Sequence, residues 1–315
     1  MMKSEVEVSV IVASHRPDYV GGLAALLTAA ATCSVPTEVI IVTDFCFDTL
    51  PHDYPLIHWV FLNNRSISAK RNKGISLSKG RFIAFIDDDC RPSKDWIQKG
   101  YTFLATNSEY VGVEGLTSIA SPIEAKEKPI RDYKRLENPG YRTNNIFYRA
   151  EKIKEVGCFD ERFTVQREDV DLAFSLIEKG YRIGFSPEIK ISHMVRSGEW
   201  WDLLKNCWNR RFDPLLSKKH PVLYRKQLGY SWSGSIFING VLTAASFFLL
   251  IVKNNKKVLA LPILSSILFS VRRRRDIQII SFRCAAETVS FLIAPFVLLA
   301  ALAYGSLRYR IFFLC

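Results

Sequence analysis

The run Arg81–Pro92, RFIAFIDDDCRP, constrains the fold of this chain more than any other stretch. Residues Phe82–Ile86 are apolar without polar alternation, which is typical of a central strand of a parallel sheet buried on both faces. Asp87, Asp88 and Asp89 follow directly, and three adjacent carboxylates repel one another. Open α/β sheets bind ligands at the carboxyl ends of their strands, where a divalent cation would hold such carboxylates together. We therefore expect a metal–phosphate site here, with a solvated acidic turn as the alternative.

Composition limits the class of protein. The chain has 315 residues, enough for about two domains, and 48% of them are hydrophobic. Up to about Tyr230 charges occur throughout, as in a soluble α/β protein, whereas long apolar runs separated by basic clusters follow. The net charge of +12 lies largely beside those runs, which favours a membrane protein with cytoplasmic basic loops over a nucleic-acid-binding protein. The charged first residues predict no signal peptide.

The cysteines give a second limit. There are seven, an odd number, without paired Cys-x-x-Cys spacing. This pattern predicts neither a disulfide framework nor a zinc site and fits a reducing compartment.

The first part of the chain alternates strands and helices. We expect strands at Val6–Ala13, Glu38–Thr43 and Ile57–Leu62, and helices at Tyr19–Ala31 and Ser66–Ser78, the second with Ser66 as its N-cap and Gly80 as its stop. The first unit lacks Gly-x-Gly-x-x-Gly, which argues against an ordinary dinucleotide fold.

Polar residues follow the first two expected strands. Asp44 ends the second strand at the same edge as the loop Ser14–Arg16, so it could bind a base or ribose; a turn aspartate is an equal alternative. On the helix that follows, Lys70, Arg71 and Lys73 are close in sequence to the triple aspartate. One or two of them could face an anionic ligand.

The middle of the chain continues the pattern. We expect a helix from an N-cap at Ser93 to Ala105, strands at Tyr110–Leu116 and Asn144–Arg149, a helix Glu151–Val156 ending at Gly157, and two strands, Arg182–Ser186 and Lys190–Met194, around Pro187. The stretch Ser121–Tyr141 contains Pro122, Pro129 and Pro139 and predicts a long surface loop, a common place for binding elements.

A second cluster of chemistry begins at Arg167. Glu168, Asp169 and Asp171 open a helix that runs to Lys179 and stops at Gly180. Acidic residues favour the first turn of a helix for structural reasons, but a carboxylate there could also act as a general base. His193 ends the last strand, where it could be packed, exposed or a metal ligand.

These motifs come in a familiar order: VSVIVASHRP, VTD, AKRNKGISLSKGRFIAFIDDDC, VGCFDERF, REDVDLAFSLIEKGYRI and ISH. In this order, from Val6 to Val195, the chain resembles the family 2 glycosyltransferases. The resemblance implies a GT-A fold, an α/β Rossmann-like mixed sheet flanked by helices, and an inverting transfer of sugar from a nucleotide donor without an enzyme-linked sugar.

The resemblance also implies roles for single residues. Asp89 would be the most direct ligand of Mg²⁺ or Mn²⁺, Asp87 would lie nearer the ribose or the metal, and His193 would complete the metal shell. Asp169 would be the catalytic base, with Glu168 and Asp171 as supports. The remaining implied residues would bind the donor: Ser14, His15, Arg16, Asp44, Arg71 and Asp88.

One departure from related enzymes concerns Trp200–Arg211. Processive members carry a Q-x-x-R-W-type motif soon after the acidic helix, and this segment has the aromatic and basic residues without that order. We therefore expect transfer of a single sugar. A helix-like apolar stripe from Trp200 to Leu215, interrupted by Pro214, could lie on the membrane surface or pack on the catalytic domain.

Three apolar segments follow Tyr230: Ile236–Val252, Val258–Val271 and Thr288–Tyr304. The first and third approach the roughly 20 residues of a spanning helix, whereas the second is short and contains Pro262. Basic residues number seven between Lys205 and Lys226, three after the first segment, five after the second and two after the third. This alternation predicts three spans with a cytoplasmic catalytic domain, or a hairpin in one leaflet in place of a full second span.

Together these observations predict a GT-A catalytic domain at 1–198, an interfacial linker at 199–230 and a membrane region at 231–315 with two to three transmembrane helices. The expected function is metal-dependent, inverting transfer of one sugar from a UDP, GDP or dTDP sugar to a lipid-linked saccharide or glycan at the cytoplasmic face of the cell membrane. Nucleic acid is not an expected partner. An inactive membrane-bound binding or scaffold subunit, and a nucleotidyltransferase, are the alternatives.

Overall fold

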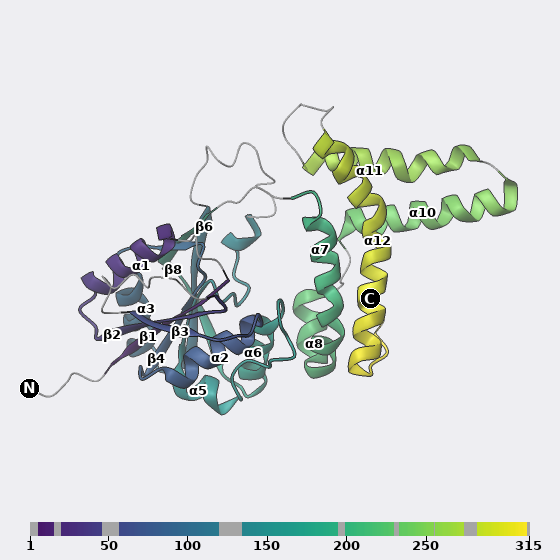
Figure 1. Cartoon of the computed structure of the whole chain (residues 1–315). Coiled ribbons are helices and arrows are strands. Elements are labelled where there is room, and N and C mark those ends of the chain that lie inside the picture. The colour runs from purple at the N-terminus through teal and green to yellow at the C-terminus, as the bar shows by residue number, and fades with distance from the viewer. Residues whose placement is uncertain are drawn as a thin grey trace, which may run out of the picture. The chain divides into compact units, whose positions relative to one another are not determined.

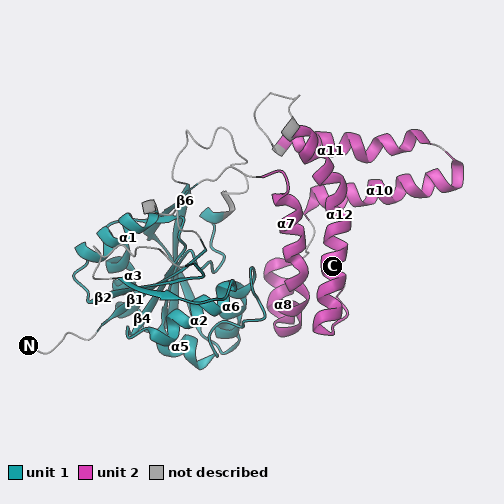
Figure 2. Cartoon of the chain, viewed as in Figure 1, with its two compact units in different colours: residues 1–121, 132–194 teal, residues 122–131, 195–315 magenta. Residues whose placement is uncertain are grey.

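The structure, a computed structural model, describes residues 6–15, 20–45, 57–119, 134–194, 199–229, 233–254, 256–273 and 282–313. Within these ranges the chain forms two compact units (Figures 1 and 2). Unit 1 comprises the described residues up to 194, and unit 2 comprises those from 199 onward.

In unit 1, one mixed sheet of eight strands is formed by the described residues, in the order β3-β2-β1-β4-β7-β6-β8-β5. The strands are β1 (Val8–Ser14), β2 (Thr37–Thr43), β3 (Ile57–Phe61), β4 (Phe82–Ile86), β5 (Cys90–Pro92), β6 (Tyr110–Ile119), β7 (Asn145–Arg149) and β8 (Arg182–His193). Strands β3, β2, β1 and β4 are parallel, whereas β7 is antiparallel to both β4 and β6. β4 is thus central and fully buried as predicted, but it has one parallel and one antiparallel neighbour.

Helices cover both faces of this sheet (Figure 1). They are α1 (Val20–Thr32), α2 (Ile67–Leu77), α3 (Trp96–Thr106), α5 (Ala150–Glu155) and α6 (Glu168–Glu178), with a 3₁₀ turn, η2, at Lys134–Glu137. Side chains alternate along β4: Phe82, Ala84 and Ile86 pack in one core with α1 and α3 residues, and Ile83 and Phe85 in another with α2, α5 and α6 residues. The unbroken apolar run of β4 follows from these two cores.

Some predicted boundaries were wrong. The two strands expected around Pro187 are one strand, β8, whose register against β6 shifts between Gly115 and Leu116. The helix α2 is confirmed, since Ser66 is its N-cap and Ser78 its C-cap. The N-cap of α3 is Asp95, because Ser93 directs its hydroxyl to the Asp95 carboxylate.

Strand β5 was not predicted, and it matters for the site. It follows the triple aspartate directly and pairs antiparallel with β8, so that Cys90 lies opposite His193. The acidic turn is therefore fixed between two strands rather than free in solvent.

Helix α1 packs closely on this acidic turn. A Cβ atom at Gly22 would lie 2.7 Å from the carbonyl oxygen of Asp88 and 2.9 Å from that of Cys90. Only a residue without a side chain allows this approach, because both neighbours are backbone atoms that cannot swing aside.

Unit 2 is helical in its described parts. It contains α7 (Asp202–Asn209), η3 (Arg210–Phe212), α8 (Asp213–Lys219), α9 (Pro221–Leu223), η4 (Tyr224–Leu228), α10 (Gly234–Lys253), η5 (Lys256–Leu259), α11 (Ala260–Arg273) and α12 (Phe282–Tyr309). Pro214 does not interrupt a helix but lies in the first turn of α8, where its missing N–H costs no hydrogen bond. Two segments are long and apolar enough to cross a membrane, Gly234–Lys253 and Cys284–Tyr309, with mean hydropathies of 2.2 and 2.0.

Buried polar side chains join the three apolar helices. Asn239 of α10 donates to Ser266 Oγ of α11 at 2.8 Å and to the carbonyl of Phe291 in α12 at 3.1 Å, and Ser265 donates to the Asn239 side chain. Ser270 of α11 and Thr288 of α12 lie 3.1 Å apart through their hydroxyls. Such bonds hold helices together where lipid removes the hydrophobic driving force for packing.

The later part of α12 packs against α7, η3 and α8. Ser290 donates to the carbonyl of Trp200 at 2.9 Å, and further along Lys218 donates to the carbonyl of Tyr309 at 2.8 Å. Near this end a Cβ atom on Gly305 would lie 2.2 Å from the Arg211 carbonyl oxygen. These contacts extend along α12 from Ser290 to its end.

We predict that Gly22→Ala displaces the acidic turn and lowers stability by about 1–3 kcal/mol, the usual cost of overpacking. In detergent this corresponds to a fall in Tm of several degrees, measurable by thermal unfolding of the whole chain. Gly234→Ala is the matched control, since a Cβ atom there meets nothing within 4 Å. Equal Tm values for the two variants would contradict the close packing of α1.

Candidate active site

The predicted donor-binding residues meet at the carboxyl edge of β1, β2 and β4. Lys70 of α2 is completely buried, and its Nζ lies 2.7 Å from the Ser14 carbonyl, 2.8 Å from Asp44 Oδ1 and 2.7 Å from His15 Nδ1. The Ser14 carbonyl and the Asp44 carboxylate accept hydrogen bonds from the ammonium, and Asp44 supplies the counter-charge that a buried lysine requires. Asp44 is therefore more than a turn residue, because it balances a buried cation.

The charges of this pair depend on each other. Burial alone would raise the pKa of Asp44, but hydrogen bonding to Lys70 and His15 outweighs it and holds the pKa below its ordinary value. For Lys70, burial is the larger effect and lowers the pKa, although Asp44 opposes the change. Both directions allow the ion pair Asp44⁻–Lys70⁺ at neutral pH.

Arg71 connects the two acidic motifs. Its guanidinium is buried and donates to Glu168 Oε1 at 2.7 Å and to Asp87 Oδ1 at 3.1 Å. Burial would lower the pKa of Arg71, but Glu168 and Asp87 raise it above its ordinary value. The side chain thus ties the end of β4 to the start of α6, which are 16 and 97 residues away from it along the chain.

The remaining members of the triple aspartate have separate partners. Asp88 accepts a hydrogen bond from Ser14 Oγ at 2.8 Å, which joins the acidic turn to the end of β1. The three carboxylates therefore do not share a single partner: Asp87 pairs with Arg71, Asp88 with Ser14, and Asp89 with the group described below.

Asp169 has an unusually high pKa for an aspartate. It is half-buried in the first turn of α6, where its Oδ1 accepts from the Val170 N–H at 2.7 Å. Burial, followed by repulsion from Glu168, raises the pKa of Asp169 to about 7. A carboxylate with this pKa can accept a proton near neutral pH, which is the property of a general base.

The two residues before Asp169, Arg167 and Glu168, also have unusual local environments. Arg167 precedes α6 with φ of 80°, in the left-handed region that costs a side-chain-bearing residue energy. Glu168 Oε2 is buried and, within the described part of the chain, has no hydrogen-bond partner. Although Arg71 pairs with Glu168 Oε1, the Glu168 carboxylate still adds to the rise in the pKa of Asp169.

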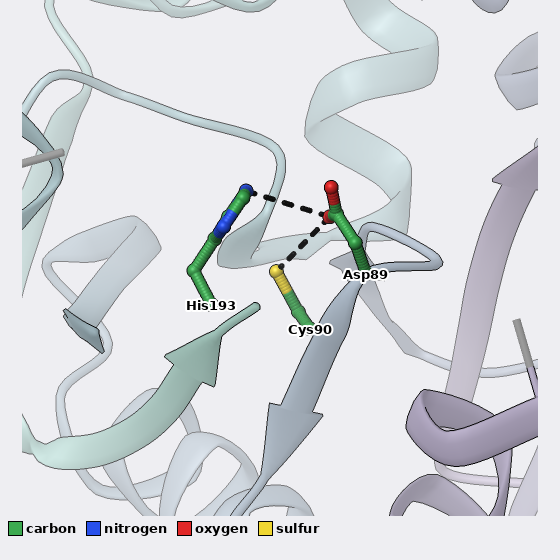
Figure 3. A group of neighbouring side chains, drawn as sticks. All are labelled: Asp89, Cys90 and His193. Carbon is green, nitrogen blue, oxygen red and sulfur yellow. Dashed lines mark hydrogen bonds and ion pairs between the residues drawn. The ribbon is translucent and has the colours of Figure 1, made fainter. Parts of the chain in front are cut away.

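Asp89, Cys90 and His193 form a group whose ligand atoms all lie within 4.8 Å of one another (Figure 3). His193 Nε2 lies 3.5 Å from Asp89 Oδ1, and the Cys90 thiol donates to the same oxygen at 3.7 Å. His193 Nδ1 is 2.9 Å from the Met194 carbonyl and must donate to it. In the neutral ring Nε2 then carries a lone pair directed at a carboxylate.

This arrangement fits a divalent cation. Two acceptors, a neutral imidazole nitrogen and a carboxylate oxygen, face each other, and only a proton or a cation between them removes their repulsion. Oxygen and nitrogen donors of this type suit Mg²⁺ and Mn²⁺. Burial raises the pKa of the Cys90 thiol well above its ordinary value, and the nearby Asp87 and Asp89 add to this.

Of the other predicted residues, Arg16 lies outside the described residues. Asp171 is buried in α6, and Lys73 is half-buried on α2. The loop Ser121–Tyr141 is described only from residue 134 onward.

Sequence reasoning missed Glu114 of β6. This buried carboxylate accepts backbone N–H groups of Gly140 at 2.8 Å, Tyr141 at 2.7 Å and Arg142 at 3.2 Å. Burial raises its pKa, although these three bonds act in the opposite direction. A charged residue inside the apolar strand Tyr110–Leu116 was the available signal.

Two family models match the chain. The model "Glycosyl transferase family 2" covers residues 24–159, and "Glycosyl transferase family group 2" covers residues 140–307, more than half of the chain. The first includes the acidic turn, and the second includes Asp169 and His193.

Several curated proteins are similar. Over 152 residues the chain is 28% identical to pre-mycofactocin glycosyltransferase of Mycobacterium tuberculosis. The match covers 43% of this chain and 31% of that protein. Glycosyltransferase AglE of Haloferax volcanii is 27% identical over 135 residues, covering 41% and 44%. This chain thus matches less than half the length of either. Glucosyl-dolichyl phosphate glucuronosyltransferase of Haloferax volcanii is 24% identical over 236 residues, covering 64% of this chain and 75% of that protein.

Among solved structures, the mannosyltransferase PcManGT from Pyrobaculum calidifontis, in complex with GDP-Man and Mn²⁺, has a TM-score of 0.62 at 16% identity, covering 93% of this chain and 87% of that one. This likeness confirms the predicted GT-A fold. Together with the family model that spans more than half of the residues, it leads to one conclusion: the chain belongs to the family 2 glycosyltransferases.

Proposed function

We propose that this protein transfers a single sugar, with inversion, from a UDP, GDP or dTDP sugar to a lipid-linked saccharide or glycan, and that it needs Mg²⁺ or Mn²⁺. The observation that carries the proposal is one sheet edge with two different carboxylate environments. Asp89 Oδ1 lies 3.5 Å from His193 Nε2, and Asp169 has a pKa raised to about 7. The environment of Asp89 suits a divalent cation, and that of Asp169 suits the uptake of a proton.

Donor binding uses the residues along this edge. Asp44, held by Lys70 and next to His15, would accept hydrogen bonds from the base, with Ser14 and Arg16 bordering the same pocket. Asp87 and Asp88 would lie toward the ribose and diphosphate, with Arg71 supplying fixed positive charge. Because these groups already hold one another in place, little of the binding energy is lost in ordering them.

Asp89 and His193, with Asp87 nearby, would hold the divalent cation, which when bound supplies Lewis-acid stabilisation of the departing nucleoside diphosphate. Asp169 would take the proton from the acceptor hydroxyl as its oxygen attacks the sugar. Glu168 cannot take this role easily, since Arg71 fixes its Oε1. Asp171, buried behind them, would support the helix start. Attack from the side opposite the leaving group inverts the anomeric centre.

The other two candidate functions are separated by the tests below. A scaffold subunit would bind no nucleotide sugar. A nucleotidyltransferase would form a nucleotide-sugar bond rather than break one, and such enzymes usually carry a Gly-rich basic loop after the first strand, where this chain has Ser14-His15-Arg16-Pro17.

We predict that Mn²⁺-dependent binding of one nucleotide-sugar class is lost on adding excess chelator and in Asp89→Ala. A panel of UDP, GDP, dTDP and CMP sugars, titrated calorimetrically into detergent-solubilised protein, measures this. Asp95→Asn is the control, because Asp95 lies outside the site with 51% of its side chain exposed. If wild type binds none of these nucleotides with or without metal, the scaffold alternative gains the stronger support.

For Asp169→Asn we predict a loss of kcat of about 10²–10⁴-fold with nucleotide binding retained, the usual contribution of a general base. In wild type, kcat/KM should rise with pH and level off above about pH 7, because the ionised form of Asp169 is the active one. Glu151→Gln is the control, an exposed acid (73%) in the first turn of α5.

Asp169→Asn should also be more stable than wild type at alkaline pH. Since the folded-state pKa of about 7 lies above the ordinary value of 3.8, wild type loses stability as pH rises between these values. At pH 8 Asp169→Asn should unfold at higher temperature than wild type, by an amount equivalent to about 2 kcal/mol, and the difference should vanish near pH 4. An inactive variant that is also destabilised at pH 8 would indicate a structural role instead.

We further infer that the helices of unit 2 attach the protein to the membrane. α10 and α11 expose large apolar side chains, which are costly in water and expected in a bilayer. They are Phe237, Ile238, Val241, Phe247, Phe248, Ile251, Val252, Leu261, Ile263, Leu264, Ile267 and Leu268. With 20 residues α10 extends about 30 Å, and η5 with α11 provides the return.

α12 also exposes large apolar side chains, among them Ile293, Phe296 and Leu299, but it packs against further helices of unit 2. The contacts Ser290–Trp200 and Lys218–Tyr309 keep α7, η3 and α8 along it, so a crossing by α12 would carry Arg210, Arg211 and the fully buried Asp213 into hydrocarbon. We therefore propose two crossings, by α10 and by η5 with α11, while α12 lies with α7 and α8 at the cytoplasmic surface. In this division 1–198 is catalytic, and the interfacial part comprises 199–230 together with α12.

This arrangement predicts a cytoplasmic C-terminus. A reporter fused after Cys315 should have the cytoplasmic signal, and one inserted at the turn residue Asn254 should have the opposite signal. Three crossings, as expected from the alternation of basic residues, would move the C-terminal reporter to the opposite face. A cytoplasmic signal at Asn254 would contradict a crossing by α10.

A further inference from the structure

Cys90 places a sulfur atom beside the two residues that would hold the divalent cation. Because Cys90 and His193 are paired opposite each other in β5 and β8, their side chains approach the Asp89 carboxylate together (Figure 3). The Cys90 sulfur lies 3.7 Å from Asp89 Oδ1, and His193 Nε2 lies 3.5 Å from the same oxygen. The strand pairing, and not any Cys-x-x-Cys spacing, assembles this set.

The three donors differ in their preference for metals. Thiolate, imidazole and carboxylate together are the ligands of zinc sites, and three protein ligands with an open fourth position are common there. Mg²⁺ and Mn²⁺ prefer oxygen and make little use of a thiolate, whereas Zn²⁺ and Cd²⁺ bind it strongly. Sulfur therefore adds affinity for soft cations only.

We propose that Asp89, Cys90 and His193 form a binding site for a soft divalent cation, Zn²⁺ or Cd²⁺, which competes with the Mg²⁺ or Mn²⁺ of the reaction. The competition, though not the soft-metal site itself, rests on the proposed function, because Asp89 and His193 would serve both ions. Zinc then acts as an inhibitor of donor binding rather than as the cofactor.

Binding changes one covalent bond. A metal–sulfur bond forms at Cys90 while its S–H bond breaks, the proton passes to water, and nothing is oxidised or reduced. Only 2% of Cys90 is exposed, so water competes poorly for the sulfur once the metal is bound. His193 keeps its Nδ1 proton on the Met194 carbonyl and presents Nε2 to the metal.

The test uses the full chain in detergent without nucleotide. Cd²⁺ is titrated in, and the ultraviolet cadmium–thiolate charge-transfer band is recorded for wild type, Cys90→Ser and Cys33→Ser. Cys33 is a suitable control, a free cysteine of unit 1 whose thiol contacts Gln98. We expect a saturable band of one equivalent in wild type and in Cys33→Ser, and its loss in Cys90→Ser. A wild type without the band, or the same band in all three proteins, would overturn the proposal.

His193→Gln provides a second route if Cys90→Ser does not fold. It should keep the thiolate but weaken cadmium binding, and unchanged binding would also overturn the proposal. Competition between Zn²⁺ and Mn²⁺ is measured separately, as the loss of Mn²⁺-dependent nucleotide binding when Zn²⁺ is added. If nucleotide binding needs no metal, the proposed function fails while the cadmium band persists, so the two failures are distinguishable.

Discussion

The site depends on the two ion pairs that the buried guanidinium of Arg71 makes. It joins Asp87 at the end of β4 to Glu168 at the start of α6 and stacks near the Phe159 ring, 5.6 Å away. Breaking a buried pair by removing one partner generally costs about 3–5 kcal/mol, because a charge is left without a counter-charge. The same bridge fixes the spacing between the acidic turn and the proposed base. It also holds Glu168 next to Asp169, whose pKa that neighbour helps to raise.

Electrostatic balance along the sheet edge follows a common rule. The buried cations Lys70 and Arg71 are paired with carboxylates. Asp89 lies beside the His193 imidazole, and Asp169 lies beside a second carboxylate. Perturbed titratable groups of this kind, such as Asp169, are typical of functional positions.

Much of this fold could be predicted from the sequence, because β4 is apolar on both faces and α2 and α6 carry clear start signals at Ser66 and Glu168. Strand β5 could not be predicted, because three residues are too few to show a pattern of hydrophobic residues. They form a strand only by pairing with β8. For the same reason the sequence indicated Asp89 and His193 as ligands but not Cys90. The partners of Lys70 and Glu114 depend on tertiary packing, which no local pattern records.

The manner in which Glu114 holds the chain before β7 has a consequence for how this protein can diversify. Its carboxylate accepts hydrogen bonds from main-chain N–H groups at 140–142 and also lies 3.9 Å from the Arg142 guanidinium. Tyr141 has a φ of 62°, in the left-handed region that few side-chain-bearing residues adopt, so this position tolerates fewer residues than an ordinary loop position. Loss of Glu114 would remove all three backbone bonds at once, so the conformation of this stretch depends on a single buried acid.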